Sequence, residues 1–112
     1  MNNTPWKYSI EFINTLKDDE VFETSNMLNY VRKKKPKVSA STLSKHRIIL
    51  YRLGFLDRIN KSNYIFAYIK KKSFIYDVGF QEAKMVAYPK YGWEQWFIPP
   101  GWKILDKYKE DN

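Results

Sequence analysis

The side chains that could do chemistry are few, and they are not the kinds that catalysis needs. The chain has no cysteine, which excludes thiol catalysis, disulfides and thiolate zinc sites. His46 is the single histidine, and no nucleophile or carboxylate shares its face of the helix expected there. We therefore expect no enzyme activity, no catalytic residue, no metal and no cofactor, and no small-molecule substrate is evident.

Positive charge is concentrated in the middle of the chain. Thirteen of the twenty Lys and Arg residues lie between positions 30 and 72, where Asp57 is the one acid, and the whole chain carries a formal net charge of +8. Charge gathered in this way is typical of a surface that meets a polyanion. The pattern favours a nucleic acid as partner, and double-stranded DNA in particular.

Size and composition indicate one folded domain. The 112 residues are 44% hydrophobic and 18% aromatic, too high for a disordered basic tail. No apolar stretch is long enough to cross a bilayer, and the first residues lack the layout of a signal peptide. We expect an intracellular protein with no membrane partner, cytoplasmic or nucleoid-associated, or in the host cytoplasm if viral. The frequent Lys, Ile, Asn and Tyr suit a viral or microbial genome.

Periodicity and capping signals predict helices at residues 5–17, about 25–35 and 41–53. Thr4-Pro5 is a typical helix start, Thr24 or Ser25 is expected to cap the second helix, and Gly54 is expected to end the third in a left-handed conformation.

Extended segments are expected around and after these helices. Residues 55–59 and 64–69 predict a hairpin with a polar loop at 60–63, and residues 21–22 a short extended link. Residues 73–78 could prolong the second strand, and residues 81–87 could form a short helix.

The third predicted helix has two faces of different chemistry. At about 100° per residue, the apolar face collects Leu43, His46, Ile49, Leu50 and Leu53. The other face collects Ser41, Ser44, Lys45, Ile48 and Arg52, with Arg47 and Tyr51 at one flank. Such a helix buries one side and offers the other to a partner.

Residues 5–72 resemble a winged helix-turn-helix domain. The resemblance is carried by the first two helices, by the run SASTLSKHRIILYRLGFL at 39–56 and by the hairpin. In this family the serine-rich turn precedes a recognition helix, and the Leu-x-x-Leu-Gly-Phe-Leu ending closes that helix and enters the wing. The resemblance implies an α+β fold of three helices plus a β-hairpin wing. Arg47 departs from the pattern, since its position is often apolar. Either the helix is rotated slightly, or Arg47 snorkels from the core edge.

The candidate DNA contacts lie on the third helix, the hairpin and the basic turn. Short polar side chains near a helix N-terminus suit phosphate or base contacts, long cations suit guanine or phosphate, and turn lysines suit flanking phosphates. They are Ser41, Thr42, Ser44, Lys45, Ile48 and Arg52 on the helix, Arg58, Lys61 and Asn63 on the wing, and Lys33, Lys34, Lys35 and Lys37 in the turn. Ile48 could meet a thymine methyl, pack on the C-terminal segment or join a dimer.

The expected organisation is a winged helix-turn-helix domain at 1–72 and an aromatic, Pro-rich extension at 73–112 packed on it. Trp93, Trp96 and Trp102 could pack back on the domain or stack on single-stranded bases, with a short helix from Lys103. An acidic group at residues 11–23 could suggest a metal site, but we interpret it as a solvated face turned away from DNA.

Three functions stay open at this point. The first is a small transcriptional regulator that binds double-stranded DNA, reading the major groove with the helix at about 41–53 and touching the backbone or minor groove with a wing at 58–64. The second is a non-specific DNA or RNA binder, such as a packaging, chromatin or single-strand protein. The third is a winged helix used for protein assembly. The target site, activation or repression, and the existence of a homodimer are left open.

Overall fold

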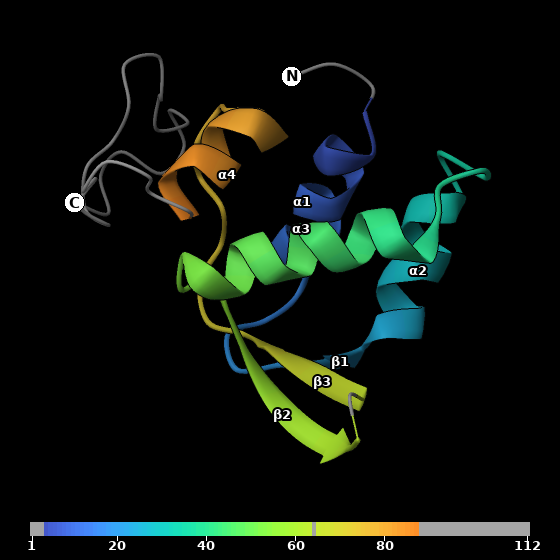
Figure 1. Cartoon of the computed structure of the whole chain (residues 1–112), viewed down its shortest axis with the longest axis vertical. Helices are drawn as coiled ribbons and strands as arrows, with labels where there is room; N and C mark the ends of the chain where they lie inside the picture. Colours follow the sequence, from blue (N-terminus) through green and yellow to red (C-terminus); the bar gives the residue numbers. More distant parts are fainter. Residues whose placement is uncertain (1–3, 64, 88–112) are drawn as a thin grey trace.

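The computed structural model describes residues 4–63 and 65–87, and this part of the chain forms four helices and one three-stranded antiparallel sheet (Figure 1). The elements are α1 (Pro5–Thr15), β1 (Val21–Glu23), α2 (Thr24–Arg32), α3 (Ala40–Arg52), β2 (Leu56–Ser62), β3 (Ile65–Lys70) and α4 (Phe80–Ala87). The α+β class expected from the sequence is confirmed. In Figure 1, α3 crosses in front of α1, and the hairpin of β2 and β3 descends from the end of α3.

Helix α1 begins where its sequence predicts, with Thr4 extended before Pro5 at the first helical position. Its inner face carries Trp6 into the core, where 2% of that residue stays exposed. The helix ends at residue 15, slightly before the predicted 17. Just beyond it, the buried ammonium of Lys70 donates to the carbonyl of Leu16. This bond satisfies a carbonyl that the ending helix leaves without a partner.

Helix α2 is capped by a residue other than the two predicted. Thr24 is already helical, and Glu23 is the N-cap, with its N–H donating to Asn26 Oδ1 at 2.8 Å. The expectation of Thr24 or Ser25 was wrong because β1 holds Glu23 in the extended conformation that a cap requires.

Helix α3 begins and ends one residue before the predicted bounds of 41 and 53. Ser39 Oγ accepts the N–H of Thr42 at 3.2 Å, so the serine-rich turn does supply the cap. Gly54 follows the helix at φ 88°, in the left-handed region. The N–H of Phe55 then donates to the carbonyl of Leu50 at 2.9 Å, which closes the helix end in a Schellman turn.

The sheet has the order β1-β3-β2, so β3 pairs with a strand on each side. The predicted link at residues 21–22 is therefore the start of an edge strand. The four-residue loop predicted at 60–63 is wrong, since residues 60–62 belong to β2. The register shifts between Asn60 and Ser62, and such a bulge accommodates one more residue on β2 than simple pairing would.

The chain leaves the sheet after β3, so the prediction that residues 73–78 prolong the strand is wrong. Asn14 of α1 holds both backbone groups of Phe74: its Nδ2 donates to the carbonyl at 3.1 Å, and its Oδ1 accepts the N–H at 2.9 Å. Phe74 is fully buried in the same core as Trp6. Burial of Phe74 in that core and its two hydrogen bonds with Asn14 direct the segment away from the sheet and toward the helices.

The segment after Phe74 completes the core with the predicted short helix, α4. The indole N–H of Trp6 donates to the carbonyl of Val78 at 3.1 Å, and Ala83 and Ala87 of α4 are buried. Residues 73–87 thus share one core with the preceding elements. The predictions for residues 88–112, including the packing of their tryptophans and a helix from Lys103, lie outside the described residues. Across residues 4–63 and 65–87, no helix has the length and apolar character needed to span a membrane.

Candidate nucleic-acid interface

Helix α3 turns the two predicted faces in the predicted directions. Leu43, His46, Ile49 and Leu50 are buried, and Leu53 is half-buried. Ser41, Lys45 and Arg52 are exposed, Thr42, Ser44 and Ile48 are half-buried, and α3 contains no Asp or Glu. The open side of α3 is therefore polar and cationic along the length of the helix, with Ile48 as its apolar member.

Arg47 is enclosed in the protein, 7% exposed, rather than at the helix flank where the sequence places it. Its Nη1 lies 3.6 Å from Met27 Sδ, and its guanidinium lies 5.6 Å from the Tyr68 ring centroid. Its Nε has no hydrogen-bond partner within the described part of the chain. Burial lowers the pKa of Arg47 from its ordinary value, against the opposing effect of Tyr68. Arg47 is thus unavailable to a partner on the open face.

Four lysines occupy the turn between α2 and α3, at the right of Figure 1. Helix α2 ends at Arg32, earlier than the predicted 35. The N–H groups of Lys33 and Lys34 donate to carbonyls three residues back, those of Tyr30 and Val31, in the pattern of a turn. Arg32 Nε donates to the carbonyl of Val38 at 3.1 Å and so closes the turn. Three of its lysines are exposed and one is half-buried, and none forms an ion pair with a described residue: Lys33, Lys34, Lys35 and Lys37.

The hairpin divides its predicted contacts between its two faces. Arg58 pairs in register with the buried Tyr68, on the face turned toward the helices. Its guanidinium lies 4.3 Å from the ring centroid of Tyr51 on α3 and 4.5 Å from that of Phe66. Arg58 is therefore held beside the open face of α3.

Lys61 instead forms an ion pair with Glu23 of β1, with 2.6 Å between Nζ and Oε1. Glu23 pairs in register with Ala67, as Ile59 does, which places this ion pair on the face of the sheet turned away from Arg58. Asn63 follows β2 and is exposed. The structure thus brings Arg58, and not Lys61, next to α3.

No match to this chain is found among protein-family models, curated proteins or solved structures. What the site does must therefore be argued from its own geometry.

His46 has the surroundings of a structural histidine. Its Nδ1 lies 2.8 Å from Ser9 Oγ, and its ring contacts those of Trp6 and Phe80 at centroid distances of 5.2 and 5.1 Å. Burial, and then the charge of Arg47, lower the pKa of His46 from 6.5 to about 4. The imidazole is consequently neutral at physiological pH. The part of the chain in view holds no group of three or more His, Asp or Glu side chains that could bind a metal ion.

Sequence reasoning missed two partners of the predicted contacts. Tyr51, placed at the helix flank, supports Arg58. Arg52 Nε donates to the carbonyl of Ala87 at the end of α4, at 2.8 Å. No local pattern in the sequence joins position 51 with position 58, or position 52 with position 87.

Proposed function

We propose that the protein binds double-stranded DNA through α3 and acts as a small transcriptional regulator with a winged helix-turn-helix fold. The observation that carries the proposal is the open face of α3, which bears Lys45 and Arg52, lacks any acid and lies beside Arg58 and the lysine turn. Three helices followed by a hairpin is also the order that the sequence resemblance implies.

A helix of this kind fits the major groove of B-DNA, with its N-terminal side chains closest to the bases. Ser41 and Ser44 are short, so the helix backbone can approach base edges, while Lys45 reaches farther and Arg52 lies near the end of α3 with its Nε bonded to the Ala87 carbonyl. Ile48 stands between them, and an apolar side chain in this place suits a thymine methyl.

The lysine turn and Arg58 flank α3 and suit contacts with the phosphate backbone. Such contacts add affinity without adding sequence information, and they make binding strongly salt-dependent. In this arrangement, the regulator would act by occupying its site. The acidic residues between positions 18 and 23 would face away from the duplex.

The deciding experiment selects duplexes from a random pool and then measures binding to a selected and a scrambled duplex over a salt series. We expect the selected duplex to bind more tightly and the affinity to fall steeply with salt. Lys45→Ala should weaken binding more than Lys17→Ala, which removes one equal charge from the exposed loop after α1. Equal losses in the two variants would refute the role of α3, and equal affinity for both duplexes would favour a non-specific binder.

The outer face of the sheet favours a second role, contact with another copy of the chain. Val21, Ile59 and Ile65 are 51%, 43% and 57% exposed, and the strand register places them on this one face. Its neighbouring charges are matched or acidic, since Lys61 pairs with Glu23 and Asp57 shares the face. Two copies of a chain with net charge +8 repel each other, and an interface without excess positive charge adds least to that repulsion. We propose that a homodimer forms here, and a monomer by light scattering at all concentrations would reject it.

A further inference from the structure

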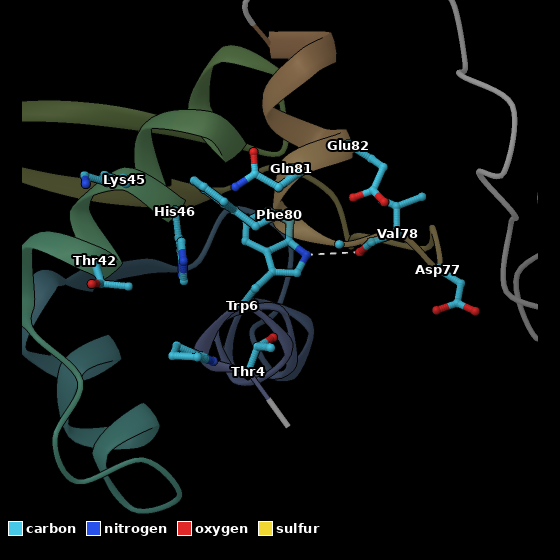
Figure 2. Close-up of a pocket in the computed structure, with 12 residues that line it drawn as sticks. Thr4, Trp6, Thr42, Lys45, His46, Asp77, Val78, Phe80, Gln81 and Glu82 are labelled. Atoms are coloured by element: carbon cyan, nitrogen blue, oxygen red, sulfur yellow. Dashed lines mark hydrogen bonds between the residues drawn. The ribbon is translucent and has the colours of Figure 1, made fainter. Parts of the chain in front are cut away.

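A cavity of about 720 Å³ opens between the start of α1, the middle of α3 and the segment leading into α4 (Figure 2). Its walls are residues 4–6, residues 42, 45 and 46, and residues 77–82. Ligand sites in proteins commonly enclose roughly 300–1,000 Å³. Sequence patterns predict no small-molecule site here, because these three segments lie far apart along the chain.

Aromatic rings line the inner wall of this cavity. Trp6 and His46 are 2% and 4% exposed, and their centroids lie 5.2 Å apart at nearly right angles. Phe80 stands 5.6 Å from Trp6 and completes the group (Figure 2). The bond from the Trp6 indole to the Val78 carbonyl fixes the tilt of that ring. Phe80 is the half-buried member of the group, so it offers a flat aromatic body the open part of a wall that Trp6 and His46 hold rigid from behind.

His46 adds one neutral polar group to that wall. Its Nδ1 is engaged by Ser9, while its Nε2 has no partner among the residues that the structure describes. His46 is one of the residues that line the cavity. A neutral imidazole nitrogen can form a hydrogen bond with a polar atom on the ring system of a ligand. Because it is uncharged, it repels neither a cationic nor an anionic ligand.

Three charged residues of the described part of the chain line the rim of the cavity: Lys45, Asp77 and Glu82. The two acids have contacts with other residues of the protein. Lys45 is exposed and forms no ion pair with a described residue. The carboxylate of Glu82 folds back over Gly79, so that a Cβ on Gly79 would stand 3.1 Å from its Oε2. A carboxylate at the beginning of a helix is stabilised there by the helix dipole. Asp77 has interactions of its own. Lys45 is thus the one cation among the described lining residues, which also include the carboxylates of Asp77 and Glu82.

We propose that this cavity binds a small aromatic carboxylate, with its ring against Trp6, His46 and Phe80 and its carboxylate at Lys45. The regulatory consequence rests on the proposed function, because Lys45 also belongs to the face of α3 that would contact DNA. A ligand that takes Lys45 then competes with the duplex, and the molecule becomes a ligand-released DNA binder.

Three probes that share one ring system test the ligand class: 2-naphthoate, 2-naphthalenemethanol and 2-naphthylmethylammonium, titrated by calorimetry up to about 1 mM. We expect 2-naphthoate to bind most tightly, and Lys45→Gln to weaken it roughly tenfold while leaving the alcohol unchanged. Lys84→Gln, which removes an exposed lysine of α4 outside the cavity, should change neither. Equal binding of all three probes, no saturable binding, or equal losses in the two variants would overturn the proposal.

The link to DNA is tested separately, by adding 2-naphthoate to the preformed complex with the selected duplex. Release of the duplex, retained in Lys84→Gln, supports competition, and simultaneous binding of both refutes it. Binding of 2-naphthoate without any DNA binding would leave the cavity site standing and defeat the proposed function. DNA binding without 2-naphthoate binding would leave the proposed function standing and defeat the cavity site.

Discussion

The guanidinium of Arg58 in β2 lies 4.3 Å from the ring centroid of Tyr51 on α3, which joins the hairpin to the helix by a cation–π contact. The same guanidinium lies 4.5 Å from the ring of Phe66 in β3. Held between two rings, a cation that would otherwise sweep a wide volume keeps one position beside the open face of α3.

The Arg58–Tyr51 contact predicts coupled effects on DNA affinity. Arg58→Gln should weaken duplex binding roughly five- to tenfold at low salt, since it removes a backbone contact. Tyr51→Leu should weaken it less, and a double-mutant cycle on stability should give a coupling of about 0.5–1 kcal/mol. Lys61→Gln, which removes a cation from the opposite face of the hairpin, is the matched control. If that variant loses as much affinity as Arg58→Gln, the hairpin does not present Arg58 to the duplex.

Gly54 predicts a backbone effect without a steric one. Its φ of +88° lies in the left-handed region, yet a Cβ there would meet nothing within 4 Å. Gly54→Ala should therefore cost about 1–2 kcal/mol of unfolding free energy, measured in urea, from backbone strain alone. Gly79→Ala is the control, because Gly79 has no such φ and its Cβ would meet only the movable end of Glu82. A Gly54→Ala variant as stable as the parent would contradict the helix ending described for α3.

Arg47 predicts that removing a buried charge does not destabilise the protein. Its guanidinium is 7% exposed and has no carboxylate partner within the described residues. Arg47→Met keeps the volume and removes the cost of burying a cation, so the unfolding free energy should stay equal or rise by about 1–3 kcal/mol. Arg47→Ala should lower it, because the shorter side chain leaves a cavity beside Met27. A loss above about 2 kcal/mol in Arg47→Met would show that the contacts with Tyr68 outweigh the desolvation of the charge.

His46 predicts how stability depends on pH. Burial lowers its pKa from 6.5 to about 4, so between these values the unfolded chain binds a proton that the folded chain does not. The free energy of unfolding should therefore rise with pH through this window. The protein should be about 3 kcal/mol less stable below pH 4 than above pH 6.5 as a result of this one group. Urea unfolding of the parent and of His46→Gln at each pH isolates this effect, since the carboxylates titrate in both. Identical pH profiles would show that His46 does not carry it.

Local signals predicted the helices well, because a helix is closed by residues near it in sequence. Thr4-Pro5 and Gly54 mark helix ends in the structure where the chain predicts them, and the serine-rich turn caps α3 one residue before the predicted start. The periodicity of α3 also separated its buried face from its open face. These features depend on backbone geometry over four or five residues, which a sequence shows directly.

Features that depend on distant residues were missed or misplaced. The pairing of residues 21–23 with β3 joins segments more than forty positions apart, and it also decides that Glu23 caps α2. The enclosure of Arg47 depends on Met27 and Tyr68, one before it and one after it in the chain. The cavity needs three separate segments. Each of these features arises from packing between distant segments, and a local sequence pattern does not identify the residues that pack together.

The amide of Asn14 limits which side chains can stand at this position. Its nitrogen donates to the Phe74 carbonyl and its oxygen accepts the Phe74 N–H. One side chain thus makes the two backbone hydrogen bonds that a neighbouring strand would make. An aspartate at this position would replace the donor by a second oxygen, which would then face the carbonyl. The return of the chain from the sheet to the helices, and with it one wall of the cavity, thus depends on an amide nitrogen that the isosteric acid lacks.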